Sequence, residues 1–172
     1  MKIIDALKVF NRLKKKKVFE DYAVGGAMAV TYYVDARATR DLDIFLLTDN
    51  EGYDLTWRIL EESGYEHLED SIVVEGVPVD IVPSNQHPFY EQAIRNSKEV
   101  RIGDIPTKIF TPEYLIATKL LSFRNKDKVD MYDLFKYKKI DMVKLEDILS
   151  GGFEGEEKLL LKRLQRILEE ED

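Results

Sequence analysis

The chain has 172 residues, 44% of them hydrophobic, which is enough for one domain with a real core. It contains no cysteine and only two histidines, which excludes disulfides, thiolate zinc sites and cysteine nucleophiles and disfavours a histidine-rich metal centre. A net charge of −7 disfavours broad nonspecific binding to nucleic acid. No apolar run approaches the ~18 residues that span a bilayer, and the start lacks a signal-peptide pattern. We therefore expect a cytoplasmic protein that does not contact a membrane.

Helices and strands are mixed in the first part of the chain. Apolar residues at helical spacing predict a first helix over residues 2–16. The other elements predicted before residue 111 are strands at 22–24, 41–47, 70–75 and 78–83 and a strand pair within 99–110, with helices at 27–34, 51–63 and 87–96. Glu75-Gly76 is a plausible hairpin turn between two of these strands.

The chain is predicted to be helical after residue 110. Thr111-Pro-Glu predicts a helix start with an N-cap, a proline in the first turn and an early acid. The expected helices are 112–124, 128–138, 143–149 and 154–171. This order predicts an α+β fold, in which a mixed sheet flanked by helices precedes a C-terminal helical segment. We divide the chain into a core of residues 1–110 and a helical segment of residues 111–172 that packs on the core.

The lysine run and the aromatic residues have ordinary structural explanations. The run Lys14–Lys17 is the densest positive patch, and a solvated helix C-terminus explains it better than contact with a nucleic acid does. Aromatic rings could stack on a nucleotide base, although core packing accounts better for most of them. The rings considered are those of Tyr22, Tyr32, Tyr33 and Phe45.

Two aspartates stand two residues apart in the predicted strand 41–47. Alternate residues of a strand point to the same face, so Asp41 and Asp43 place two carboxylates side by side while Leu42 and Ile44 face the core. Adjacent carboxylates repel one another, and a divalent cation relieves the repulsion. Oxygen ligands without histidine or cysteine suit Mg²⁺ or Mn²⁺. Such pairs also occur in sugar-nucleotide glycosyltransferases and at solvated strand ends.

Two further features point to phosphate and metal chemistry. Gly25 and Gly26 follow an apolar strand and precede a helix, where glycine lets the backbone approach a phosphate, although most such pairs are simple turns. Asp80 stands within the apolar run Val77-Pro-Val-Asp-Ile-Val. A buried, unpaired carboxylate is costly, so Asp80 either meets a cation or takes a backbone partner at a strand end.

These three features together resemble the nucleotidyltransferase superfamily that includes DNA polymerase beta and the aminoglycoside nucleotidyltransferases. Its signature is a hydrophobic residue with Gly-Gly or Gly-Ser, an acid-x-acid strand, and a third acid on a neighbouring strand. The signature is present here as Val24-Gly25-Gly26, Asp41-Leu-Asp43 and Asp80. The spacer is slightly long, and Gly26 stands where many members have serine, but no metal ligand is lost.

A closer resemblance is to a small prokaryotic branch that includes AbiEii-type toxins. Members often show the run present here as Arg37-Ala-Thr39-Arg40-Asp41-Leu-Asp43. They also carry a helical segment with lysine, arginine and spaced aspartates. This chain has it as Lys119-Leu-Leu-Ser-Phe-Arg124-Asn-Lys126-Asp127-Lys-Val-Asp130-Met-Tyr-Asp133.

The resemblance implies an enzyme that transfers a nucleoside monophosphate from an NTP to an acceptor and expels pyrophosphate. Asp41 and Asp43 would hold the cation that bridges the triphosphate, and Asp80 would ligate a second cation or act as general base. Backbone N–H groups of the two glycines would contact the β- and γ-phosphates. Thr39 or Arg40 would assist them.

The helical segment would add two cations to this site. Lys119 would act in catalysis by neutralising charge as pyrophosphate leaves, and Arg124 would bind the nucleotide. Asp127 and Asp130 recur at helical spacing and would orient both, unless these aspartates form an exposed helix face. The competing interpretation is that the two cations are solvated, or pair with Glu113 and Asp127.

The acceptor stays open at this point. RNA such as tRNA, another translation component, a protein and a small molecule all fit, and the toxin-like resemblance adds a cognate antitoxin as a candidate partner. Two other classes remain: a non-catalytic nucleotide-binding or interaction protein on the same fold, and a glycosyltransferase. We rank the glycosyltransferase last, because it predicts a longer chain with a parallel sheet.

Overall fold

The computed structural model describes residues 2–34 and 39–171. Its strands are β1 Asp21–Val24, β2 Leu42–Leu47, β3 Glu66–Leu68, β4 Ser71–Val74, β5 Val77–Pro83, β6 Lys98–Ile102 and β7 Ile105–Ile109. They form one sheet in the order β3-β4-β5-β2-β1-β7-β6. The pairs β2–β5 and β1–β7 are parallel and the others are antiparallel. The predicted mixed sheet is therefore confirmed.

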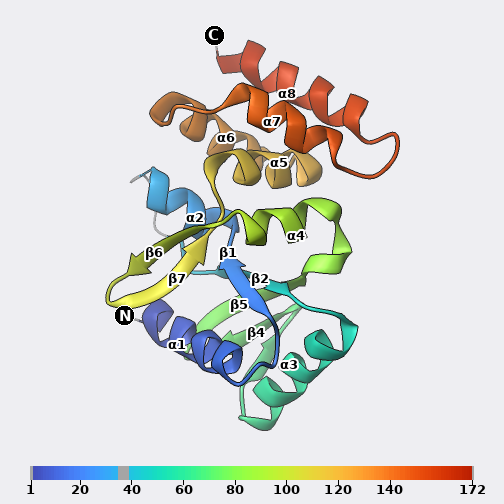
Figure 1. Ribbon diagram of the computed structural model, residues 1–172. Helices are drawn as coiled ribbons and strands as arrows, with labels where there is room; N and C mark the ends of the chain where they lie inside the picture. Colours follow the sequence, from blue (N-terminus) through green and yellow to red (C-terminus); the bar gives the residue numbers. More distant parts are fainter. Residues whose placement is uncertain (1, 35–38, 172) are drawn as a thin grey trace.

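Helices cover the sheet and continue to the C-terminus. They are α1 Lys2–Lys15, α2 Gly26–Tyr33, α3 Asn50–Glu62, α4 Pro88–Arg95, α5 Pro112–Ser122, α6 Asn125–Tyr137, α7 Met142–Ser150 and α8 Glu157–Glu171, with a short 3-10 turn η1 Ser84–Gln86. Figure 1 shows α2 and α4 between the sheet and α5–α8, while α1 and α3 lie on the other side of the sheet. No helix in the two described ranges is long and apolar enough to cross a membrane.

Strand β2 lies at the centre of the sheet because almost all of its side chains are apolar. Leu42, Ile44 and Leu46 are fully buried, and Phe45 and Leu47 are nearly so. A strand covered by helices or neighbours on both faces needs such a continuous apolar run. Asp43 is the one position of β2 that is partly exposed. A charged side chain thus enters the middle of the sheet, and its surroundings decide the chemistry there.

The helical segment after residue 110 shares its core with the sheet. Apolar residues of α5, Leu115 and Ile116 among them, are fully buried in the same cluster as the sheet residues. Helix α5 contacts both α2 and α4. The division at residue 110 stays a prediction, but the C-terminal helices pack directly above the helices that cover β2.

Local signals predicted most element starts. Glu75 and Gly76 both have positive φ, 52° and 78°, as a tight hairpin turn between β4 and β5 requires. Strand β3 was not predicted, because its three residues are all exposed and show no alternating pattern. Thr111 does occupy the N-cap of α5, but its hydroxyl makes no cap hydrogen bond and is buried without a partner among the described residues.

Candidate active site

Two of the predicted acids lie side by side on neighbouring parallel strands. Asp43 on β2 is the register partner of Asp80 on β5. Paired positions on adjacent strands direct their side chains to the same face. Burial raises the pKa of the Asp43 carboxyl, and the charge of Asp80 raises it further, with a smaller contribution from Asp41. The three acids, distant along the chain, are therefore within electrostatic reach of one another.

The three carboxylates have different surroundings. Asp41 is exposed and directly precedes β2, so it lies outside the strand that was predicted to contain it. Asp80 accepts a short hydrogen bond from the hydroxyl of Ser71 on β4. Its partner is thus a side chain and not the backbone. Ser71 was not anticipated from the sequence, because it becomes a neighbour of Asp80 only through the pairing of β4 with β5.

The two glycines at the start of α2 serve different neighbours. Gly26 has φ of 57°, and a Cβ added there would lie 1.8 Å from Oδ2 of Asp43. A Cβ at Gly25 would instead lie 2.5 Å from Cε2 of the Phe45 ring. Gly26 therefore lets the N-terminus of α2 lie directly against the Asp43 carboxylate. At Gly25, a larger side chain would clash with the Phe45 ring, so core packing explains that glycine. N–H groups at a helix start can bind an anion, so a phosphate role remains open for both.

The segment before β2 adds little to the site. Thr39 places its hydroxyl 3.4 Å from the backbone oxygen of Asp41, and Arg40 is exposed. Arg37, the first residue of the run that resembles the AbiEii-type toxins, lies outside the described residues. Neither Thr39 nor Arg40 lines the cavity beside Asp43. Their proposed help with the phosphates stays a prediction.

A cavity of about 370 Å³ lies beside Asp43. Its polar lining includes Lys119, Arg124 and Asp127, which the sequence had singled out from the helical segment. Its apolar lining includes Phe45, Tyr90 and Leu121. A small-molecule site of this size commonly combines an apolar wall with a few charged groups. Phe45 was among the rings considered for base stacking, whereas Tyr90 was missed, because the sequence around it carries no signal that links α4 to this cavity.

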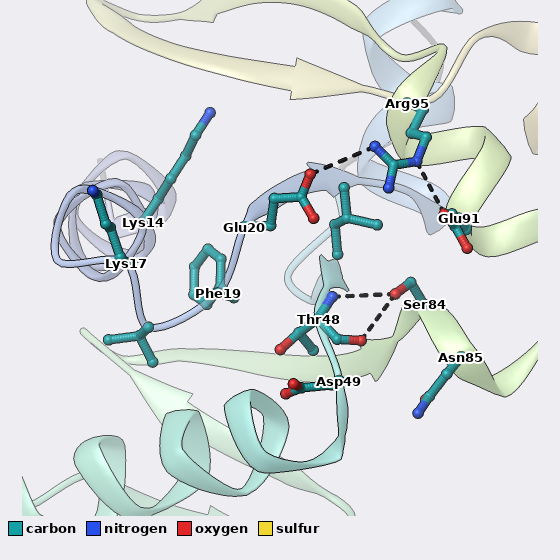
Figure 2. Close-up of a pocket in the computed structure, with 12 residues that line it drawn as sticks. Lys14, Lys17, Phe19, Glu20, Thr48, Asp49, Ser84, Asn85, Glu91 and Arg95 are labelled. Carbon is teal, nitrogen blue, oxygen red and sulfur yellow. Dashed lines mark hydrogen bonds and ion pairs between the residues drawn. The ribbon is translucent and has the colours of Figure 1, made fainter.

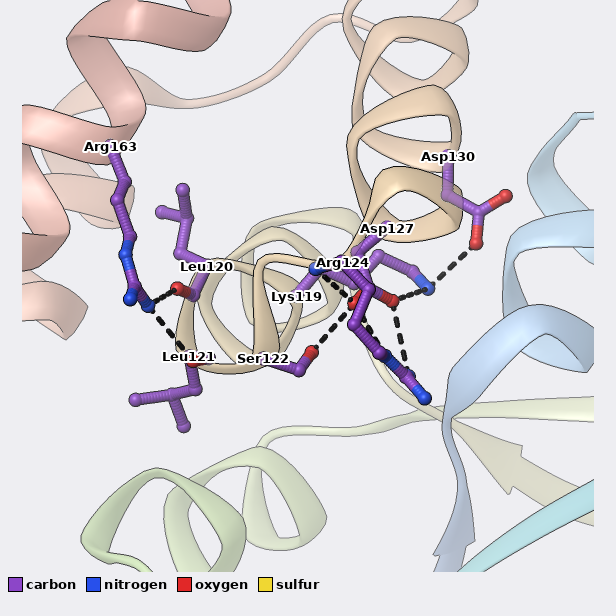
Figure 3. A network of polar contacts seen from close by, with 8 residues as sticks. All are labelled: Lys119, Leu120, Leu121, Ser122, Arg124, Asp127, Asp130 and Arg163. Atoms are coloured by element: carbon purple, nitrogen blue, oxygen red, sulfur yellow. Dashed lines mark hydrogen bonds and ion pairs between the residues drawn. The ribbon is translucent and has the colours of Figure 1, made fainter.

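Lys119 is the centre of a buried polar network (Figure 3). It is only 6% exposed. Its ammonium group donates to Oδ2 of Asp130 at 2.7 Å and lies 3.6 Å from Oδ1 of Asp127. Glu113, the alternative partner, instead accepts from the backbone N–H of Asp141 at 3.0 Å. Lys119 is therefore neither solvated nor paired with Glu113. Both Lys119 and Arg124 do lie next to Asp127, as the competing interpretation expected.

Asp127 joins this network to the end of α5. One of its carboxylate oxygens accepts from the Ser122 hydroxyl, the Arg124 backbone N–H and the Arg124 Nε, each at 2.9 Å. Burial acts to raise the pKa of Asp127, but the hydrogen bonds from Arg124 and Ser122 outweigh burial, and the net pKa is lowered. The side-chain hydrogen bond between Arg124 and Asp127 raises the pKa of Arg124. Two cations and two carboxylates thus form a preorganised network at the cavity.

A larger cavity lies elsewhere, at the far end of β2. It measures about 830 Å³ and is lined by Lys14 and Lys17 of the basic run, but by none of the predicted site residues. Figure 2 shows Arg95 of this cavity paired with two acids, 3.5 Å from Glu20 and 3.0 Å from Glu91. We take the smaller cavity as the candidate site, because it lies beside Asp43 and its register partner Asp80.

The residues around Asp43 meet part of what a metal ion needs. In the part of the chain that the structure describes, no group of three or more His, Cys, Asp or Glu side chains is arranged to hold a metal ion. The donor chemistry nevertheless fits a hard divalent cation, since Asp43 and Asp80 supply neighbouring oxygen ligands and their repulsion shows in the raised pKa of Asp43. The charges of Lys119 and Lys126 act in the opposite direction and lower the pKa of Asp43.

Solved structures with similar folds have low sequence identity to this chain. An antigenic nucleotidyltransferase-like protein from Paracoccidioides brasiliensis has 19% identity and a TM-score of 0.59 over 96% of this chain and 88% of that one. The antibiotic-resistance factor ANT(2'')-Ia has 14% identity and a TM-score of 0.57 over 86% of this chain and 90% of that one. Its complex with adenylyl-2''-tobramycin has 13% identity and a TM-score of 0.55 over 92% and 98%. At these identities the likeness shows the fold alone.

At the level of sequence, no curated protein matches the chain. A family match covers almost all of it, residues 3–166, and so includes Gly26, Asp43, Asp80 and the Lys119 network. The chain belongs to the family described as nucleotidyl transferase of unknown function (DUF2204).

Proposed function

We propose that this nucleotidyl transferase moves a nucleoside monophosphate from an NTP to an acceptor with the help of Mg²⁺ or Mn²⁺. The observation that carries the proposal is the pairing of Asp43 with Asp80 directly beneath the glycine at the start of α2. Clustered carboxylates next to a helix N-terminus suit a metal–phosphate ligand, which brings positive charge to the acids and negative charge to the N–H groups.

In the proposed reaction an acceptor oxygen attacks the α-phosphorus of the NTP. The new oxygen–phosphorus bond forms as the bond to the bridging oxygen between the α- and β-phosphates breaks, and pyrophosphate leaves. A divalent cation held by Asp41, Asp43 and Asp80 would neutralise phosphate charge. Asp80 is also the candidate general base for the acceptor proton.

The remaining groups would bind and orient the nucleotide. The backbone N–H groups at Gly25 and Gly26 would contact the β- and γ-phosphates. Lys119 and Arg124, already positioned by two aspartates, would neutralise the charge that develops on pyrophosphate. The apolar lining formed by Phe45, Tyr90 and Leu121 offers a surface for the base.

The acceptor is a separate part of the proposal. A complex of ANT(2'')-Ia contains adenylyl-2''-tobramycin, which favours including small molecules among the acceptors. The toxin-like resemblance favours tRNA or another translation component, with an antitoxin as partner. Each acceptor class needs its own arm in the assay.

One observation favours a second candidate, a nucleotide-binding protein without turnover. The Asp80 carboxylate is held by Ser71, and the three acids form no closed cluster among the described residues. A protein of this kind would bind an NTP and release no pyrophosphate. The glycosyltransferase alternative has lost its support, because the family is one of nucleotidyl transferases.

The test is pyrophosphate release from each NTP with Mg²⁺ and with tRNA, aminoglycoside or protein acceptors. We expect release with at least one combination and its loss in Asp80→Asn. Asp54→Asn, at an exposed acid on α3, is the matched control and should retain activity. Nucleotide binding by calorimetry without release in any arm would favour the second candidate, and no binding at all would refute both.

A further inference from the structure

The turn between α5 and α6 carries two of the groups that face the cavity. Ser122 ends α5, Phe123 forms the turn, and Arg124 is the N-cap of α6. Phe123 has left-handed backbone angles, φ 49° and ψ 34°. A bulky residue adopts this region only where its surroundings hold it there. The direction in which Ser122 and Arg124 point depends on this conformation.

The end of α5 leaves backbone carbonyls that need donors. The last carbonyls of a helix have no partner within the helix. That of Lys119 accepts from the Phe123 N–H at 2.8 Å. Those of Leu120 and Leu121 accept from a single nitrogen of Arg163, at 2.7 and 2.9 Å. A cation at a helix C-terminus also favours the helix dipole.

Arg163 comes from α8, more than forty residues later in the chain. Its guanidinium carbon lies 5.0 Å from the centroid of the Phe123 ring, so it contacts both the backbone before the turn and the side chain within it. Figure 3 shows Arg163 and Arg124 on opposite sides of the end of α5. Arg163 does not line the cavity beside Asp43.

We infer that Arg163 is a positioning residue for nucleotide binding: it clamps the end of α5 and the Phe123 turn so that Ser122 and Arg124 meet Asp127 at the cavity. The turn is thus held from two sides, by α8 through Arg163 and by α6 through Asp127. The inference rests on the proposed function, because it assigns the C-terminal helix a part in nucleotide affinity.

The test uses the full chain and two matched variants. Arg163→Met keeps an apolar stem but removes the donors to the two carbonyls. Arg166→Met is the control: Arg166 is on the same helix, its guanidinium carbon is 6.0 Å from the Phe123 ring, and its Nε bonds to Glu170 at 2.8 Å. The first measurement is amide hydrogen exchange of residues 123–128. We expect at least about tenfold faster exchange there in Arg163→Met, with β2 unchanged, since the opening is local.

The second measurement is the calorimetric Kd for each NTP with Mg²⁺. We expect a Kd about tenfold higher in Arg163→Met, partial recovery in Arg163→Lys, and no change in Arg166→Met. A merely structural role would speed exchange in β2 as well.

Three results would count against the proposal in different ways. Unchanged exchange in the turn, or the same effect from Arg166→Met, overturns the clamp. Faster local exchange with an unchanged Kd overturns the role in binding. If the wild-type chain binds no NTP although exchange responds as expected, the proposed function fails and the clamp on the turn stands.

Discussion

The two ends of strand β2 differ in how their acidic side chains are paired. At the start of the strand, Asp43 lies beside Asp80, and both burial and that neighbouring charge raise the pKa of Asp43. At the other end, Asp21 on β1 pairs in register with Leu47 and lies 2.7 Å from Lys14 and 2.5 Å from Lys108. Burial alone would raise the pKa of Asp21, but these two lysines lower it.

This contrast separates a stabilising arrangement from one suited to a ligand. Opposite charges in contact stabilise the folded state even when no ligand is bound. Like charges under partial burial cost free energy unless a ligand of opposite charge arrives. The larger cavity lies at the balanced end and the smaller one at the unbalanced end. The distribution of charge, and not cavity size, is therefore the basis of the proposed site.

The largest expected effect comes from removing the unbalanced charge. Asp43→Asn should lower pyrophosphate release at least about a hundredfold, because an amide cannot replace the carboxylate at a metal–phosphate site. The free energy of unfolding should stay the same or rise, since repulsion from Asp80 disappears. Steady-state release and thermal unfolding check both. Retained release would separate Asp43 from the chemistry, and a marked loss of stability would contradict the contrast between the two ends.

A methyl group at Gly26 should disturb the same end by contact. Gly26→Ala would place Cβ 1.8 Å from the Asp43 carboxylate in a residue with positive φ. Gly64→Ala is the matched control, because Gly64 also has positive φ, 88°, but nothing within 4 Å of the added Cβ. Both variants should lose about 1–2 kcal/mol from backbone strain. Only Gly26→Ala should also weaken NTP binding by calorimetry, and equal binding losses in the two would remove Gly26 from the site.

At the balanced end the expected loss is in stability alone. Asp21→Asn should lower the free energy of unfolding by about 1.5–3 kcal/mol, the range for a hydrogen bond to a charged group. Pyrophosphate release should be unchanged at temperatures where the chain is folded. Urea unfolding and the release assay measure the two effects. A loss of release without unfolding would show that this end also serves the reaction.

The pH dependence of stability should have opposite signs at the two ends. Because the folded-state pKa of Asp21 is lowered, its stabilisation is complete above the unfolded pKa of about 3.9 and is lost as pH falls through the folded pKa. Because that of Asp43 is raised, stability falls as pH rises from about 3.9 to its folded pKa. Unfolding of the wild type and of each Asn variant between pH 3 and 7 gives the two differences. Slopes of the same sign would contradict the contrast.

Removing the hydrogen bond to Asp80 should have the smallest effect. Ser71→Ala frees one carboxylate oxygen and should change pyrophosphate release only a few-fold, about 1 kcal/mol in the barrier. The direction of the change in release shows what Ser71 does. An increase indicates that Ser71 competes with a ligand for Asp80, and a decrease indicates that it orients the carboxylate. A loss as large as that expected for Asp43→Asn would make Ser71 itself part of the chemistry.

Local patterns were sufficient for much of the fold and for part of the site. The hairpin at Glu75-Gly76 and the helix start at Pro112 follow from backbone preferences within a few residues, and the structure has both. The i, i+3 spacing of Asp127 and Asp130 placed both on one face of a helix, and both contact Lys119. Strand β3 was not predicted, because its exposed edge residues carry no burial pattern.

The sequence by itself determined which groups can do chemistry: the carboxylates, the glycines at a helix start and the cations of the helical segment. Only the tertiary structure decided which of them meet. Asp80 reaches Asp43 because β5 pairs in parallel with β2, with α3, β3 and β4 between them in the chain. Tyr90 reaches the cavity, and Arg163 reaches the end of α5, from elements that carry no sequence signal for these contacts. The physical reason is range: backbone preferences act over a few residues, whereas sheet register and helix packing depend on burying the whole apolar core at once.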